Sequence, residues 1–124
     1  MTLTEDILRA AYAYLAETPP FNKWNLPDAE DVKFVVGTRG RDQGECRTVV
    51  YSQGTPDERC DFTIMISKWH HNYTFTLLQT MAHEMVHVHQ RHNCINRGKR
   101  SHGTDFKALA LEVCECHGFD PGQF

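Results

Sequence analysis

The histidines of this chain are concentrated, since seven of the eight lie between positions 70 and 102. Within that stretch, the segment from His83 to His87 reads HEMVH, which matches the pattern HExxH. Side chains four positions apart lie about 40° apart around a helix, so His83 and His87 can share one metal ion. Glu84 lies about 100° to one side, close to a metal-bound water without being a ligand. The spacing therefore predicts a zinc site of a hydrolase, with Glu84 as general base.

A catalytic zinc ion takes three protein ligands and leaves a fourth position for water, so one more ligand must come from elsewhere. His89 and His92 face away from the metal stripe at helical spacing. We expect them on the solvated side of the helix, although together with Cys94 they would be candidates for a second metal site. A longer zinc motif needs glycine and histidine where this chain has Gln90 and Asn93, which excludes that class.

The remaining candidates for the third ligand lie in or just before the last predicted helix: His102, Glu112, Cys114 and His117. His102 is favoured because it immediately precedes that helix and because Gly103 lets the backbone come close. Glu112 is the second candidate, since some zinc peptidases take a glutamate from a following helix. The predicted cofactor is Zn²⁺, although Mn or Co would also suit such a nitrogen site.

Three helical segments are predicted. Thr2 and Glu5 fit a capping box before the first helix. The second helix runs from about residue 75 to about residue 92, with Thr74 as its cap, and carries HExxH. The last helix has one apolar face and stops at Gly118.

Three short β-like runs lie between the first two helices, at residues 33–36, 47–51 and 61–67. Turn residues rich in glycine separate them. The order of elements predicts an α+β fold, and the length predicts one domain over residues 1–124.

Composition bounds the remaining function classes. Of the 124 residues, 40% are apolar and 23% are charged, a balance typical of globular proteins that are not embedded in a membrane. The start of the chain lacks the pattern of a signal peptide, so we expect a cytoplasmic protein without a membrane partner. The net charge of −3 argues against a dominant basic surface. Five cysteines without a CxxC pair indicate reduced thiols.

Two spaced segments carry a family resemblance. The HEMVH segment, a loop of about fifteen residues and the sequence HGTDF at 102–106 resemble the Spartan-related SprT-like zinc metallopeptidases. The likeness spans residues 60–118. It implies a zincin-type fold, here as a minimal catalytic domain, and a protein or peptide substrate. In that family, the two HExxH histidines and the later histidine bind zinc and the glutamate is catalytic, which the resemblance carries over to His83, His87, His102 and Glu84.

The resemblance has further implications. In zincins, a strand beside the metal helix presents an unpaired edge to an extended peptide, which would here be residues 61–67. Spartan-related members cleave proteins crosslinked to DNA, so DNA is a possible partner, and the basic residues 97–100 could contact phosphates or form a solvated loop. Near them, Trp69, Tyr73 and Phe75 are interpreted as packing anchors rather than as base-stacking residues.

Two other functions stay open. One is a deformylase-like hydrolase, in which Cys46 or Cys60 would replace His102 as a ligand. The other is a non-catalytic adaptor that uses zinc for stability and binds nucleic acid or a protein.

Overall fold

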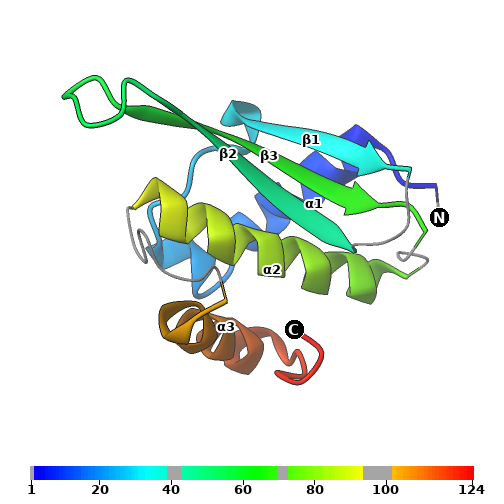
Figure 1. Ribbon diagram of the computed structural model, residues 1–124. Helices are drawn as coiled ribbons and strands as arrows, with labels where there is room; N and C mark the ends of the chain where they lie inside the picture. The colour runs from blue at the N-terminus through cyan, green and yellow to red at the C-terminus, as the bar shows by residue number, and fades with distance from the viewer. Residues whose placement is uncertain (1, 39–42, 70–72, 94–101) are drawn as a thin grey trace.

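The computed structural model describes residues 2–38, 43–69, 73–93 and 102–124. Its helices and strands follow the predicted order. These residues form three α-helices, two short 3-10 turns and a three-stranded mixed sheet, which confirms the α+β class (Figure 1). The elements are α1 (Glu5–Ala16), β1 (Val32–Gly37), β2 (Gly44–Tyr51), β3 (Arg59–Ser67), α2 (Thr74–His92) and α3 (Thr104–His117), and the 3-10 turns are Phe21–Lys23 and Ala29–Asp31.

The sheet has the order β1-β3-β2. β3 pairs in parallel with β1 and antiparallel with β2, which places Ile66 opposite both Val36 and Gly44. The prediction that residues 61–67 present a free edge was therefore wrong, because β3 is the central strand. Among the described residues, β2 pairs only with β3 and is the edge strand that packs against α2.

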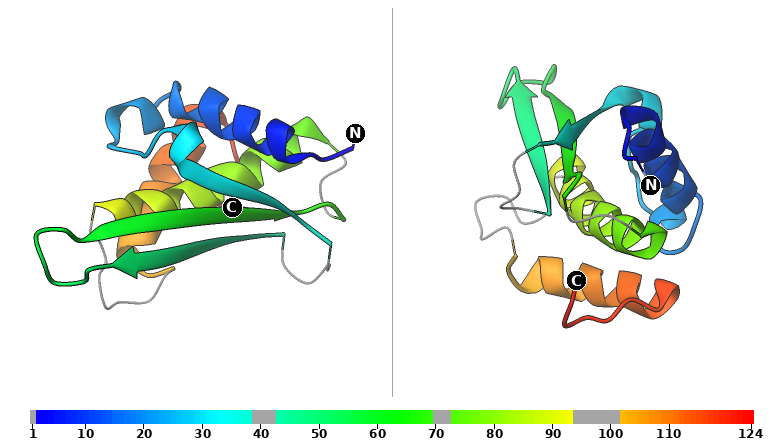
Figure 2. Two further views of the ribbon diagram at one scale, coloured as in Figure 1. Left: turned by 90° about the horizontal axis from the view of Figure 1, so that it is seen from above. Right: turned by 90° about the vertical axis from the view of Figure 1, so that its right-hand side faces the viewer.

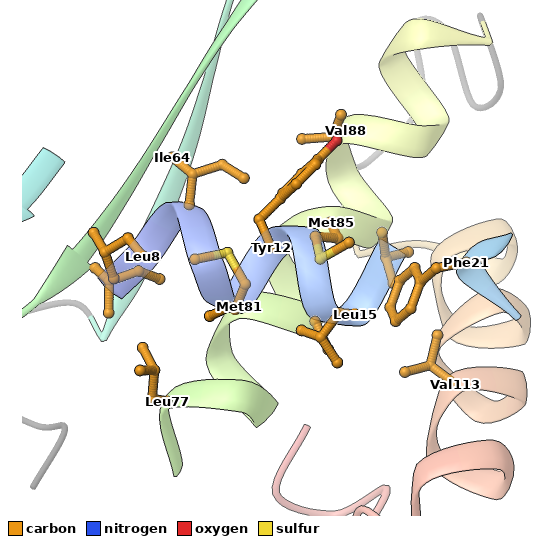
Figure 3. Close-up of a cluster of buried hydrophobic side chains, with 14 of the residues drawn as sticks. Leu8, Tyr12, Leu15, Phe21, Ile64, Leu77, Met81, Met85, Val88 and Val113 are labelled. Carbon is orange, nitrogen blue, oxygen red and sulfur yellow. The ribbon is translucent and has the colours of Figure 1, made fainter. Parts of the chain in front are cut away.

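The core contains buried residues of α1, α2 and the sheet, and α3 adds further residues to it. Apolar residues three or four positions apart on α1 meet the corresponding face of α2 and the inner face of β3 (Figure 3). Figure 2 shows α3 on the side of α2 away from the sheet, so α2 is covered on both sides. The fully buried residues of this cluster include Leu8, Tyr12, Leu15, Ile64, Met81, Met85 and Val88.

Several predicted boundaries needed correction. The side chain of Thr4, not of Thr2, caps α1 by accepting a hydrogen bond from the Ile7 amide at 3.2 Å. α2 begins at Thr74 itself, and its N-cap Tyr73 makes no side-chain capping bond. β2 starts at Gly44, three residues before the predicted run. Gly118 ends α3 in the left-handed conformation with φ 76°, as predicted.

Candidate metal and catalytic site

Three histidines converge between α2 and the start of α3. His83 and His87 project from one face of α2, and His102 lies two residues before α3. The Nε2 atom of His102 lies 3.2 Å from Nε2 of His83 and 3.0 Å from Nε2 of His87. The three possible ligand atoms all lie within 4.8 Å of one another. The structure thus brings together the three residues that the sequence nominated.

This spacing fits one small metal ion. Nitrogens bound at about 2.0–2.1 Å to a single tetrahedral zinc ion lie about 3.3 Å apart. The two distances to His102, 3.2 and 3.0 Å, are close to that value, and the His83–His87 pair lies within 4.8 Å. Three imidazoles are also a donor set that Zn²⁺ favours. The residues therefore fit the predicted metal.

The segment after α3 orients one of these rings. Nδ1 of His83 lies 3.1 Å from the backbone carbonyl oxygen of Phe124. A carbonyl oxygen only accepts hydrogen bonds, so Nδ1 carries the proton and Nε2 presents its lone pair to the other histidines. Gln79 holds the same segment by donating to the carbonyl oxygen of Gln123 at 3.1 Å. Such outer contacts fix the tautomer and direction of a ligand.

Burial keeps the helix histidines neutral. It lowers the pKa of His83, and the neighbouring His102 lowers it further. The pKa of His87 falls to about 3, first through burial and then through the positive charge that His83 and His102 would carry. The ring of Phe106 contributes to this apolar setting, since it stacks on His87 with ring centroids 4.6 Å apart. Both rings are therefore in the neutral form that binds metal.

Glu84 lies beside the histidines and against β2. Its side chain is only 5% exposed and lines a cavity of about 300 Å³ with His83, His87 and His102. A Cβ atom at Gly44 would stand 2.9 Å from Oε2 of Glu84, so the absent side chain lets the carboxylate approach the strand. A carboxylate held here can exchange a proton with a water molecule in the cavity.

The other ligand candidates lie outside the histidine cluster. Nε2 of His117 is 3.0 Å from the hydroxyl of Thr18, on the α1 side of α3. Glu112 is exposed on α3, and Cys114 is buried in the core. Among the described residues, the group of converging ligand atoms consists of the three histidines.

Cys46 lines the same cavity as Glu84, which bears on the deformylase-like alternative. Burial, followed by the charge of Glu84, raises the pKa of its thiol to about 12. A zinc ion would itself deprotonate a thiol that it binds, so the position of the Cys46 sulfur decides whether it can be a ligand. Its sulfur and that of Cys60 do not belong to the converging group in the described structure.

A family model provides the comparison that identifies the chain. The model of the SprT-like family matches residues 21–122, which include all three strands, α2 and α3. The chain belongs to the SprT-like family. This SprT-like chain matches no curated protein and no solved structure. The matched range contains the three histidines and Glu84.

The second histidine pair of the SprT-like chain is part of the packing. His89 is buried, its ring stacks on Trp24 with centroids 4.2 Å apart, and its Nδ1 atom lies 3.1 Å from Nδ2 of Asn93. The prediction that His89 lies on the solvated side was therefore wrong, because Trp24 from the segment after α1 covers it. His92 is exposed, as expected, and contacts Phe62 edge-on.

The aromatic residues just before and at the start of α2 are more exposed than predicted. Trp69, Tyr73 and Phe75 are all more than half exposed, and Tyr73 is 75% exposed. Phe75 nevertheless contacts Phe119 edge-on with ring centroids 5.4 Å apart, and the indole of Trp69 donates to the carbonyl oxygen of Thr38 at 2.6 Å. The interpretation as packing anchors is therefore wrong for Tyr73, the most exposed of the three. Residues 70–72 and 94–101, which include Cys94 and the basic segment 97–100, lie outside the described residues. None of the described helices is both long and apolar enough to cross a membrane.

Sequence reasoning missed several residues around the site. Arg91 lines the cavity of Glu84. It follows Glu84 by seven residues and so lies on the same helix face, a signal that could have identified it. Gly44 and Phe124 act through contacts made in three dimensions, for which the sequence has no signal.

Proposed function

We infer that this SprT-like protein is a zinc-dependent peptidase of the zincin type, which hydrolyses peptide bonds in proteins or peptides. The observation that carries this proposal is the convergence of three histidine Nε2 atoms beside the buried carboxylate of Glu84. His83, His87 and His102 would hold the zinc ion, which would supply Lewis acidity for the activation of water.

Glu84 supplies the proton transfers. Its carboxylate takes a proton from the attacking water, and the resulting acid gives the proton to the departing amine. The carboxylate of Glu84 lies close to β2, because Gly44 has no side chain that would keep it away. Arg91, at the rim of the same cavity, supplies a cation for a substrate carbonyl or carboxylate oxygen.

The substrate backbone fits the edge of β2. Gly44 to Cys46 line the cavity of Glu84, and β2 pairs along one side only among the described residues. An extended peptide adds to such an edge through backbone hydrogen bonds, which do not depend on sequence. β2 thus takes the role that the sequence assigned to residues 61–67.

The test is the substitution Glu84→Gln in the zinc-loaded protein. Zinc content should stay at one ion per chain, while cleavage of an unfolded protein should fall at least about 100-fold, the usual contribution of a general base. Glu112→Gln is the matched control, because Glu112 is exposed on α3, and it should leave cleavage unchanged. Equal activity of Glu84→Gln and wild type would contradict the proposal. If wild type binds zinc and cuts nothing, the adaptor is favoured.

DNA-associated proteins are one proposed class of substrate, because the basic residues 97–100 follow the metal helix in the sequence. The same assay, run with single-stranded and with duplex DNA, tests this class. Stimulation by DNA that disappears at high salt would support it. The same rate with and without DNA would favour a general peptidase.

A further inference from the structure

A second cavity adjoins the metal site. It has a volume of about 590 Å³ and is lined by α3 and the segment after it, together with His83 and His102. Glu84 instead lines the smaller cavities next to β2. Besides the two histidines and Lys107, the lining consists of Phe106, Ala110, Leu111, Cys114, Pro121 and Phe124.

The wall of this cavity exposes apolar surface. Leu111 is 48% exposed, although it is a large aliphatic residue on a helix whose other face is buried. Ala110 has a small side chain, which leaves space beside Phe106. A volume of about 590 Å³ lies within the range of pockets that bind small ligands. An apolar group that covered Leu111 would remove this surface from water.

We propose that this cavity receives a large apolar side chain of the peptide substrate, next to the bond that is cut. The inference rests on the proposed peptidase function and adds to it a preference among substrate side chains. A peptide that lies along β2 with its carbonyl at the three histidines passes within reach of the cavity, because His83 and His102 line both. Backbone pairing is indifferent to sequence, so the cavity determines which side chains are accepted.

The charge at the cavity sharpens the expected preference. Lys107 is the cationic residue of the lining. It disfavours a lysine or arginine side chain in the same space. The expected order of peptides is therefore phenylalanine or leucine first, alanine next and lysine last.

The test uses three peptides that differ at one position, which holds phenylalanine, alanine or lysine. Their dissociation constants are measured by fluorescence anisotropy with the zinc-loaded Glu84→Gln protein. Burial of an aromatic side chain should make the phenylalanine peptide bind about tenfold more tightly than the alanine peptide. Cleavage by wild type, mapped by mass spectrometry, should occur next to the varied position.

Two substitutions then address the cavity itself. Ala110→Leu should narrow the cavity beside Phe106 and reduce the advantage of phenylalanine, while leaving binding of the alanine peptide unchanged. Ala13→Leu is the matched control, since Ala13 is exposed on α1. Leu111→Lys replaces an exposed residue of the cavity wall, so the variant is expected to fold. It should weaken binding of the phenylalanine peptide about tenfold.

The outcomes separate the two proposals. Equal binding of the three peptides to the Glu84→Gln protein, or an equal effect of Ala110→Leu on all three, would overturn the cavity inference alone. A zinc-loaded wild-type protein that cuts none of the peptides would overturn the proposed peptidase function and, with it, this inference.

Discussion

His87 and His89 lie two residues apart on α2, and both are buried, with 7% and 8% of their surface exposed. Burial lowers the pKa of both rings. Their partners differ completely. His87 directs Nε2 toward His102 at 3.0 Å, whereas His89 stacks on Trp24 and places Nδ1 3.1 Å from the side chain of Asn93.

The difference shows that residue type, helix and burial do not determine what a histidine does. Two residues correspond to about 200° around a helix, so the rings point to opposite sides of α2. One side meets His102 and α3, and the other meets the segment after α1. The first ring is available as a metal ligand, and the second stacks on Trp24 and has its Nδ1 atom next to Asn93.

Removal of each ring in turn should have the largest effects, and the two effects should differ in kind. His87→Ala should lower zinc affinity at least about 100-fold and abolish cleavage, because two imidazoles remain. His89→Ala should keep one zinc ion per chain but lower the free energy of unfolding by about 1–3 kcal/mol, through loss of the stack on Trp24. Zinc titration and urea unfolding measure the two effects. The same loss of zinc in both variants would contradict the assignment.

A methyl group at Gly44 tests the proposed role of Glu84 without changing a histidine. Gly44→Ala would push against Oε2 of Glu84 and should lower kcat up to about 100-fold, since small misplacements of a catalytic group are costly. Zinc content should not change. In the control Gly37→Ala, the added methyl meets the flexible side chain of Met65 and not Glu84. An unchanged kcat in Gly44→Ala would contradict the role of this close approach.

The segment after α3 allows a test of how His83 is oriented. A variant that stops at Gly122 lacks the carbonyl oxygen that orients His83, and its zinc affinity should fall about tenfold. Phe124→Ala keeps that carbonyl and serves as the matched control, with nearly unchanged affinity. Competition with a zinc-binding dye measures both constants. Equal losses in the two variants would assign the effect to the ring of Phe124 instead.

The pH dependence of stability is the smallest expected effect. The folded-state pKa values of His83, His87 and His89 lie below the unfolded value of about 6.5. The unfolded chain therefore binds more protons below pH 6.5, and the metal-free protein should lose stability as the pH falls from 7.5 to 5.5. Urea midpoints in the presence of a chelator measure this loss. It should be smaller in His87→Ala, and a midpoint that rises toward pH 5.5 would contradict the prediction.

The sequence predicted the parts of the site that depend on helical spacing. The four-residue interval of His83 and His87, and a third histidine just before a helix, follow from local geometry and were sufficient to nominate the cluster. The placement of β3 in the centre of the sheet was not predictable, because strand order depends on contacts between distant segments. The contact of Trp24 with His89 and that of Phe124 with His83 could not be predicted for the same reason.

X-ray absorption at the zinc edge of the loaded protein shows whether the three histidines bind one metal ion. We predict three nitrogen ligands at about 2.0–2.1 Å and one further oxygen ligand, with one imidazole fewer in His102→Ala. A sulfur ligand at about 2.3 Å, or a first shell unchanged in His102→Ala, would contradict the three-histidine centre.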